Sequence, residues 1–195
     1  MMLRNGLDLC IRQPLDSEAS DIAKFYETNF DEHILVKRGI LSNPEEIERE
    51  LHEKNKMWIT ARIDKTLVGC SAIEAFDWNN SAELQRAATN KEFRRMGIEK
   101  EMCKTRLSIA ENIGATYAFS YVRGPSYGAQ KSLEGLGFRV AGIIPVFYVN
   151  HNGKEVRENF VYMFRFLNNG EKELESFDNL IPMAKVIKDT IENYK

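Results

Sequence analysis

Residues 81–113 read SAELQRAATNKEFRRMGIEKEMCKTRLSIAENI and carry the strongest fold signal in the chain. Residues 82–89 are predicted to form a strand, and residues 99–113 a helix whose apolar side chains share one broad stripe. The turn between them contains Arg94, Arg95 and Gly97. A strand that runs directly into a helix leaves backbone N–H groups unpaired at the positive end of the helix dipole, so this junction favours a bound phosphate.

This turn has two interpretations. In the first, a pyrophosphate accepts backbone hydrogen bonds there, Arg94, Arg95 or Lys100 adds positive charge, and Gly97 keeps a side chain from holding the phosphates away. In the second, it is an ordinary strand–helix turn whose arginines are solvated. The turn alone supports both equally.

The rest of the chain alternates strands with helices. Further strands are predicted at residues 7–12, 57–63, 67–76, 116–122, 140–149 and 156–166. Further helices are predicted at residues 18–30, 44–53, 126–137 and 182–194. The order β-α-α-β-β-β-α-β-α-β-β predicts an α/β (α+β) fold, with a mixed central sheet, helices on both faces and a C-terminal helical extension.

Length and composition limit the class of protein. With 195 residues, 43% of them hydrophobic, the chain is long enough for one core; we expect one domain over residues 1–167 and an extension, residues 168–195, packed on it. The net charge of -2, without a stretch of one sign, argues against nucleic acid or a membrane surface as partner.

Cysteine and histidine usage favours a cytoplasmic protein without a metal. Cys10, Cys70 and Cys103 lie in apolar contexts and are expected to be buried free thiols. The three histidines lack ligand spacing, so we expect no metal site. The N-terminus carries no apolar run typical of a signal peptide or spanning helix.

The segment Phe93-Arg94-Arg95-Met96-Gly97-Ile98 resembles the pyrophosphate loop of the GNAT acyl-CoA N-acyltransferases, usually written Q/R-x-x-G-x-G/A. Arg94 takes the first position and Gly97 that of the first glycine. Glu99 stands where the family has glycine or alanine. A carboxylate beside a pyrophosphate is electrostatically adverse, unless Glu99 points outward as an ordinary first-turn acid of the helix.

A second segment, Ser126 to Phe138, resembles the family's short helix that ends in Gly-Phe before a strand. Ser126 stands where the family commonly has an asparagine that contacts the pantetheine arm, and Leu133 where it often has a tyrosine general acid. Residues 82–97 and 123–128 look most like the β-lysine N-acetyltransferases. Arg86 replaces the aspartate of that branch, so the resemblance does not extend to its substrate.

The resemblance implies acetyl-CoA as acyl donor and two adjacent parallel strands, 82–89 and 116–122, that splay apart around its acyl arm. The cofactor-binding residues expected on this basis are Ala87, Ala88, Thr89, Arg94, Arg95, Met96, Gly97, Ile98, Glu99, Lys100 and Ser126.

Acyl transfer to an amine needs a base and a proton for the leaving thiolate. Glu83, and after it Glu74, are the candidate bases, since burial of a strand carboxylate raises its pKa; alternatively, both face solvent on the polar side of their strands. Tyr127 and Ser126 are candidates to protonate the thiolate, although Ser126 is as well explained as a helix cap. Arg123 is expected to bind a substrate carboxylate or to lie in solvent.

These features predict an N-acetyltransferase that moves an acetyl group from acetyl-CoA directly to a primary amine of a small molecule, such as an amino acid or polyamine. Because no cysteine looks activated, no covalent intermediate is expected. The alternative is a GNAT-fold module that binds acyl-CoA or a partner without turnover, and a third reading is an oligomeric structural protein. The apolar stripe of residues 183–191 is interpreted as packing or as a homodimer contact.

Overall fold

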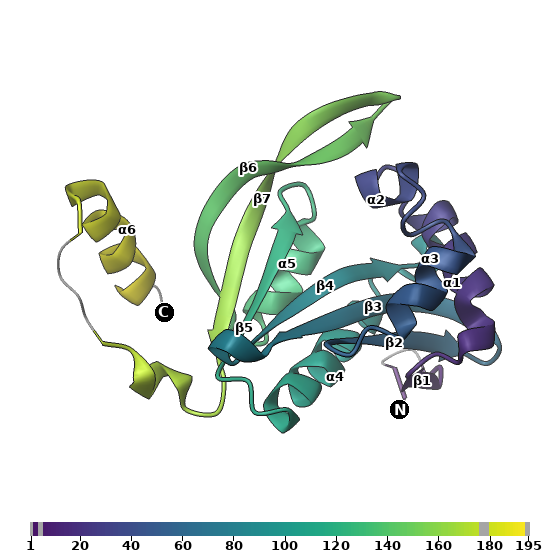
Figure 1. Cartoon of the computed structure of the whole chain (residues 1–195), viewed down its shortest axis with the longest axis horizontal. Coiled ribbons are helices and arrows are strands. Elements are labelled where there is room, and N and C mark those ends of the chain that lie inside the picture. Colours follow the sequence, from purple (N-terminus) through teal and green to yellow (C-terminus); the bar gives the residue numbers. More distant parts are fainter. Residues whose placement is uncertain (1, 4–5, 176–179, 194–195) are drawn as a thin grey trace.

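A computed structural model describes residues 2–3, 6–175 and 180–193 of the chain. Its centre is a seven-stranded sheet in the order β1-β2-β3-β4-β5-β7-β6 (Figure 1). The strands are β1 (Leu9–Arg12), β2 (Lys56–Ile63), β3 (Thr66–Phe76), β4 (Ser81–Thr89), β5 (Tyr117–Arg123), β6 (Arg139–His151) and β7 (Lys154–Phe166). Neighbouring strands are antiparallel except β4 and β5, which are parallel.

The helices are α1 (Ala19–Asn29), α2 (Ile34–Lys37), α3 (Pro44–Leu51), α4 (Ile98–Asn112), α5 (Tyr127–Glu134) and α6 (Pro182–Asn193), with 3-10 turns η1 (Asp16–Glu18), η2 (Asp77–Asn79), η3 (Lys91–Phe93) and η4 (Gly170–Glu173). Helices cover both faces of the sheet, as the sequence predicts, whereas α6 lies apart from the other helices (Figure 1). Residues of α1 and α3 pack on one face, against Trp58, Cys70 and Ala72. Residues of α4 and α5 pack on the other, against Ile73 and Leu84.

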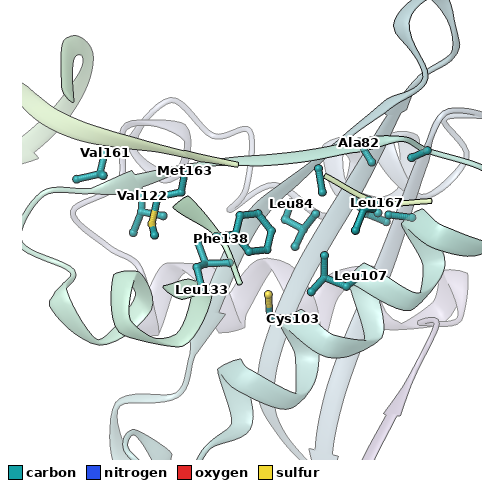
Figure 2. Close-up of a cluster of buried hydrophobic side chains, with 14 residues drawn as sticks. Ala82, Leu84, Cys103, Leu107, Val122, Leu133, Phe138, Val161, Met163 and Leu167 are labelled. Atoms are coloured by element: carbon teal, nitrogen blue, oxygen red, sulfur yellow. The ribbon is translucent and has the colours of Figure 1, made fainter. Parts of the chain in front are cut away.

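The core between α4, α5 and the sheet fixes the position of the turn before α4, which contains Arg94, Arg95 and Gly97. Figure 2 shows Cys103 and Leu107 of α4 directed at the strands, and Phe138 between Leu133 and Leu84. This packing holds the first turn of α4 beside β4 and the first turn of α5.

Several boundaries differ from the sequence-based expectations. The chain after α1 forms the short helix α2, which has no strong sequence pattern, and α5 ends at Glu134 rather than at Gly137. The last helix was expected to reach Tyr194, which lies outside the described residues; α6 contacts β6. Cys10 is exposed, not buried, because its side chain faces the opposite side of β1 from that of the buried Leu9, whereas Cys70 and Cys103 are buried as expected.

The sheet opens between β4 and β5. These strands pair only over Ser81–Glu83 and Tyr117–Phe119, and past Glu83 they diverge, as predicted. Arg86 has a φ of 57°, where β4 bends at a break in its register with β3. The Tyr26 hydroxyl donates a hydrogen bond to the Arg86 carbonyl and ties α1 to this bend.

Candidate active site

Two adjoining cavities occupy the opening between β4 and β5. One, of about 680 Å³, lies along the β4–α4 turn and the first turn of α5; we call it the coenzyme cavity, after the ligand that the sequence resemblance predicts there. The other, of about 260 Å³, penetrates the split itself; we call it the acceptor cavity, after the predicted amine substrate. Residues common to both linings are Phe30, Ala87, Glu99, Arg123, Ser126 and Ala129. The two cavities therefore lie side by side, with these residues between them.

The turn before α4 is built to receive an anion. Gly97 is the N-cap of α4 with a φ of 87°, a conformation that strains other residues, and a Cβ built on it would meet no atom within 4 Å. The first N–H groups of α4 have no intrahelical acceptor, and Arg94, Arg95 and Lys91 line the same cavity. These features suit a pyrophosphate group at this end of the cavity.

Most of the expected cofactor-binding residues line the coenzyme cavity. Those that do are Ala87, Thr89, Arg94, Arg95, Gly97, Ile98, Glu99 and Ser126, joined by Tyr127. Three lie elsewhere: Ala88 is buried with residues of α1 and α3, Met96 packs on the core cluster beside β1, and Lys100 is on neither lining. Ala88 differs from Ala87 and Thr89 because alternate side chains of a strand face opposite ways.

Glu99 does not point outward, which corrects one expectation from the sequence. Its Oε1 accepts a hydrogen bond of 2.7 Å from Nη2 of Arg106, whose side chain is only 2% exposed. Burial raises the pKa of Glu99, and Arg106 opposes that rise. The carboxylate thus forms an ion pair at the junction of the two cavities, and its charge is compensated by Arg106.

Glu83 lines the acceptor cavity at the point where β4 and β5 separate. Burial, and then the neighbouring charge of Glu74, raise the pKa of Glu83 to about 7, while Lys56 lowers it. Glu74 faces Glu83 across β3 and β4 but lines neither cavity; it accepts hydrogen bonds from Gln85 (2.6 Å) and Asn55 (3.1 Å). A half-buried carboxylate with a pKa near neutrality can take a proton from an ammonium group.

The other expected catalytic residues lie at the start of α5. Ser126 is the N-cap, yet its side chain makes no capping hydrogen bond, and it lines both cavities. Tyr127 is 68% exposed on the rim of the coenzyme cavity. Arg123 makes two 2.8 Å hydrogen bonds to Glu158, so its guanidinium is already engaged by a carboxylate.

His33 is a cavity residue that the sequence does not reveal. It begins α2, stacks on Phe30 with ring centroids 4.5 Å apart, and its Nδ1 accepts a hydrogen bond from the Leu35 amide. Burial, and then Arg123 and Arg86, lower the pKa of His33 to about 4, so the imidazole is neutral at pH 7. No spacing signal marks it, because the backbone bridge between His33 and Val149 brings this loop to the cavity from a distant part of the chain.

The sequence profile described as "Acetyltransferase (GNAT) family" matches residues 21–138, which include the β4–α4 turn and the start of α5. The chain belongs to this family. No curated protein sequence matches the chain at a significant level.

Solved structures of GNAT-type enzymes share the fold. The spermidine N-acetyltransferase from Vibrio cholerae in complex with CoA and spermine has a TM-score of 0.67 and 14% identity, over 84% of this chain and 98% of that one. The ribosomal-protein-alanine N-acetyltransferase from Brucella melitensis has a TM-score of 0.69 and 15% identity, over 81% of this chain and 99% of that one. An N-acetyltransferase from Staphylococcus aureus Mu50 has a TM-score of 0.70 and 12% identity, over 83% of this chain and 99% of that one. At these identities the likeness shows the fold alone.

The described residues hold neither a helix that could span a membrane nor a cluster of metal-binding side chains. In the part of the chain that the structure describes, no helix is long and apolar enough to cross a membrane. Within the same residues, no three side chains of metal-binding type come together.

Proposed function

We propose that this protein is an N-acetyltransferase that transfers the acetyl group of acetyl-CoA directly to a primary amine of a small molecule. The observation that supports it most is the position of Glu83, a carboxylate with a pKa of about 7, in a cavity that adjoins the groove at the start of α4. Family membership supports the acyltransferase class.

The residues present fit coenzyme A. Gly97 leaves open space at the N-terminus of α4, and Arg94 and Arg95 supply positive charge for the diphosphate. Ala87 and Thr89 lie along the groove between that turn and the split. When bound, the coenzyme supplies a thioester as acyl donor. Glu99 does not oppose the diphosphate with a free charge, since Arg106 pairs with it.

The transfer forms an amide bond between the amine nitrogen and the acyl carbon and breaks the carbon–sulfur bond. Glu83 takes one proton from the ammonium group, so that the nitrogen has a free electron pair. The second proton passes to the departing thiolate; Ser126 and Tyr127 are the hydroxyls at that end of the coenzyme cavity. Cys70 and Cys103 take no part, because burial raises the pKa of each thiol to about 12.

A binding measurement and a rate measurement test this proposal. Acetyl-CoA at about 100 times its Kd should add about 2.7 kcal/mol to the free energy of unfolding. Thiol release in the presence of an amine should then fall about 100-fold or more in Glu83→Gln, with coenzyme binding unchanged. The exposed Glu48→Gln on α3 is the control and should keep the wild-type rate.

Each outcome excludes one alternative. Binding without transfer to any amine would favour the GNAT-fold module without turnover. No response to the coenzyme would overturn both readings and leave a structural role. An unchanged rate in Glu83→Gln would remove that residue as the base.

Three other features belong to the proposal. A cytoplasmic location is in keeping with the free cysteines. Residues 168–195 are proposed as an extension of the one domain, and α6, whose Met183 and Val186 are exposed, as a contact in a homodimer. The β-lysine branch is not proposed for the substrate, because Arg86 pairs with Glu50 beside the cavity where that branch carries an aspartate.

A further inference from the structure

The acceptor cavity has walls of aromatic rings. Tyr121 of β5 lies against Phe147 of β6 with centroids 5.3 Å apart, and Phe147 lies 4.7 Å from Phe160 of β7. Tyr148 and Phe30 complete this lining from β6 and from the end of α1. The space enclosed, about 260 Å³, is below the range of about 300–1,000 Å³ for sites that hold drug-sized ligands. The cavity therefore suits a compact apolar body.

The guanidinium groups on the lining are all engaged by carboxylates of the protein. Arg106 pairs with Glu99, and Arg123 makes its two hydrogen bonds to Glu158. Arg86 pairs with Glu50 and lies over the ring of Trp58. A carboxylate on the acceptor would have to displace one of these partners, which leaves a buried charge uncompensated.

Glu83 differs from these groups. Among the described residues, it is the charged side chain of the lining without an ion-pair partner at salt-bridge distance. Glu74 lies opposite Glu83 on the neighbouring strand, and Glu74 and Glu50 both pair with the single ammonium of Lys56. This side of the cavity therefore favours a cation. One ammonium group finds a partner there. A second ammonium would lie at Glu99, which Arg106 already neutralises, or among the aromatic rings, whose attraction for a cation is weaker than the hydration that the ammonium loses there.

We propose that the acceptor is a compact primary amine with an apolar or aromatic body, which carries neither a carboxylate nor a second ammonium group. This inference rests on the proposed function and names the substrate class of the same site. The transfer step is the one given above: the nitrogen–carbon bond forms, the carbon–sulfur bond breaks, Glu83 takes one proton and the thiolate sulfur the other.

Matched pairs of amines test the inference. Thiol release from acetyl-CoA is measured with 2-phenylethylamine against L-phenylalanine, which adds only a carboxylate, and with butylamine against 1,4-diaminobutane, which adds only an ammonium. In each pair we expect kcat/KM for the first amine to exceed that for the second by about tenfold or more. A preference for phenylalanine or for the diamine would overturn the inference and leave acetyl transfer standing. Coenzyme binding without transfer to any amine would instead overturn the proposed function.

A charge placed in the aromatic wall gives a second test. Phe147→Glu supplies a partner for a distal ammonium and should raise the ratio of kcat/KM for 1,4-diaminobutane over butylamine by about tenfold. Ile143→Glu is the control: it lies on the same strand, 64% exposed and outside both cavities, and should leave that ratio unchanged. Thermal unfolding of both variants checks that they fold. An unchanged ratio in a folded Phe147→Glu variant would mean that this wall does not face the acceptor.

Discussion

The coenzyme cavity and the acceptor cavity share a boundary but are built in different ways. The coenzyme cavity is formed largely by two short stretches of chain, residues 87–99 and 123–129, and its anion site relies on backbone N–H groups. The acceptor cavity is formed by side chains from α2, α4, α5, β4, β5, β6 and β7, and its proposed chemistry relies on one carboxylate among aromatic rings. The backbone geometry of the coenzyme cavity is set by residues close together in the sequence. The lining of the acceptor cavity exists only once strands distant in the sequence have paired.

The Glu99–Arg106 pair at this boundary should give the largest effect on stability. Glu99→Leu leaves the guanidinium of Arg106 buried without its carboxylate, and we expect a loss of about 3–5 kcal/mol in the free energy of unfolding, measured with urea. Arg106→Leu should cost less, because burial already raises the pKa of Glu99 and the carboxyl group can become neutral.

The double variant sharpens this prediction. Replacing both residues with leucine removes the charges together and should recover much of the stability lost in Glu99→Leu. If Glu99→Leu is as stable as the wild type, Glu99 does not compensate a buried charge on Arg106. The stabilisation that acetyl-CoA gives each variant then reports whether the ion pair also keeps the coenzyme cavity in its binding shape.

Gly97→Ala tests the backbone side of the comparison with a smaller expected effect. A φ of 87° should cost alanine about 1–2 kcal/mol, although nothing obstructs its Cβ. Coenzyme affinity should fall as well, because the methyl group enters the space at the start of α4. Gly128→Ala is the matched control: it lines the same cavity, also has open space around its Cβ, and is not at a positive φ. Equal losses in unfolding free energy would contradict the conformational argument.

The same contrast explains what the sequence could predict. The order of strands and helices along the chain follows from local patterns. The split between β4 and β5 and the expected coenzyme-binding residues follow from the family resemblance, which residues 93–98 and 126–138 carry. Glu83 could be named as a candidate base because burial of a carboxylate in a strand raises its pKa. The influence of Lys56 on the pKa of Glu83 could not be predicted, because the register of β2 with β3 brings Lys56 beside Glu74, opposite Glu83.

The direction of the Glu99 side chain and the place of His33 on the acceptor cavity could not be predicted either, because both depend on tertiary packing. Arg106 lies seven residues from Glu99, two turns further along α4, where a polar residue on the helix could equally face solvent. Packing of α4 on the sheet decides that it is buried. His33 reaches the acceptor cavity through a short helix and a bridge to β6, neither of which leaves a periodic pattern.

The pH dependence of acetyl transfer gives the finest test of the acceptor side. With the pKa of Glu83 at about 7, kcat/KM should rise through neutral pH as the carboxyl group loses its proton, and fall about tenfold for each pH unit below it. Glu74 raises this pKa and Lys56 lowers it. Glu74→Gln should therefore move the acidic limb of the profile to lower pH, and Lys56→Met should move it to higher pH.

These opposite shifts separate electrostatic tuning from simple damage to the fold. A variant that only loosens the cavity lowers the rate at every pH and leaves the position of the limb unchanged. Gly97→Ala provides that comparison, since Gly97 lines only the coenzyme cavity and Glu83 lines only the acceptor cavity. Two shifts in the same direction, or a limb that stays in place in both variants, would mean that the titrating group in the rate profile is not Glu83. The base would then have to be sought among the other groups of the acceptor cavity, of which His33, neutral at pH 7, is the first to replace.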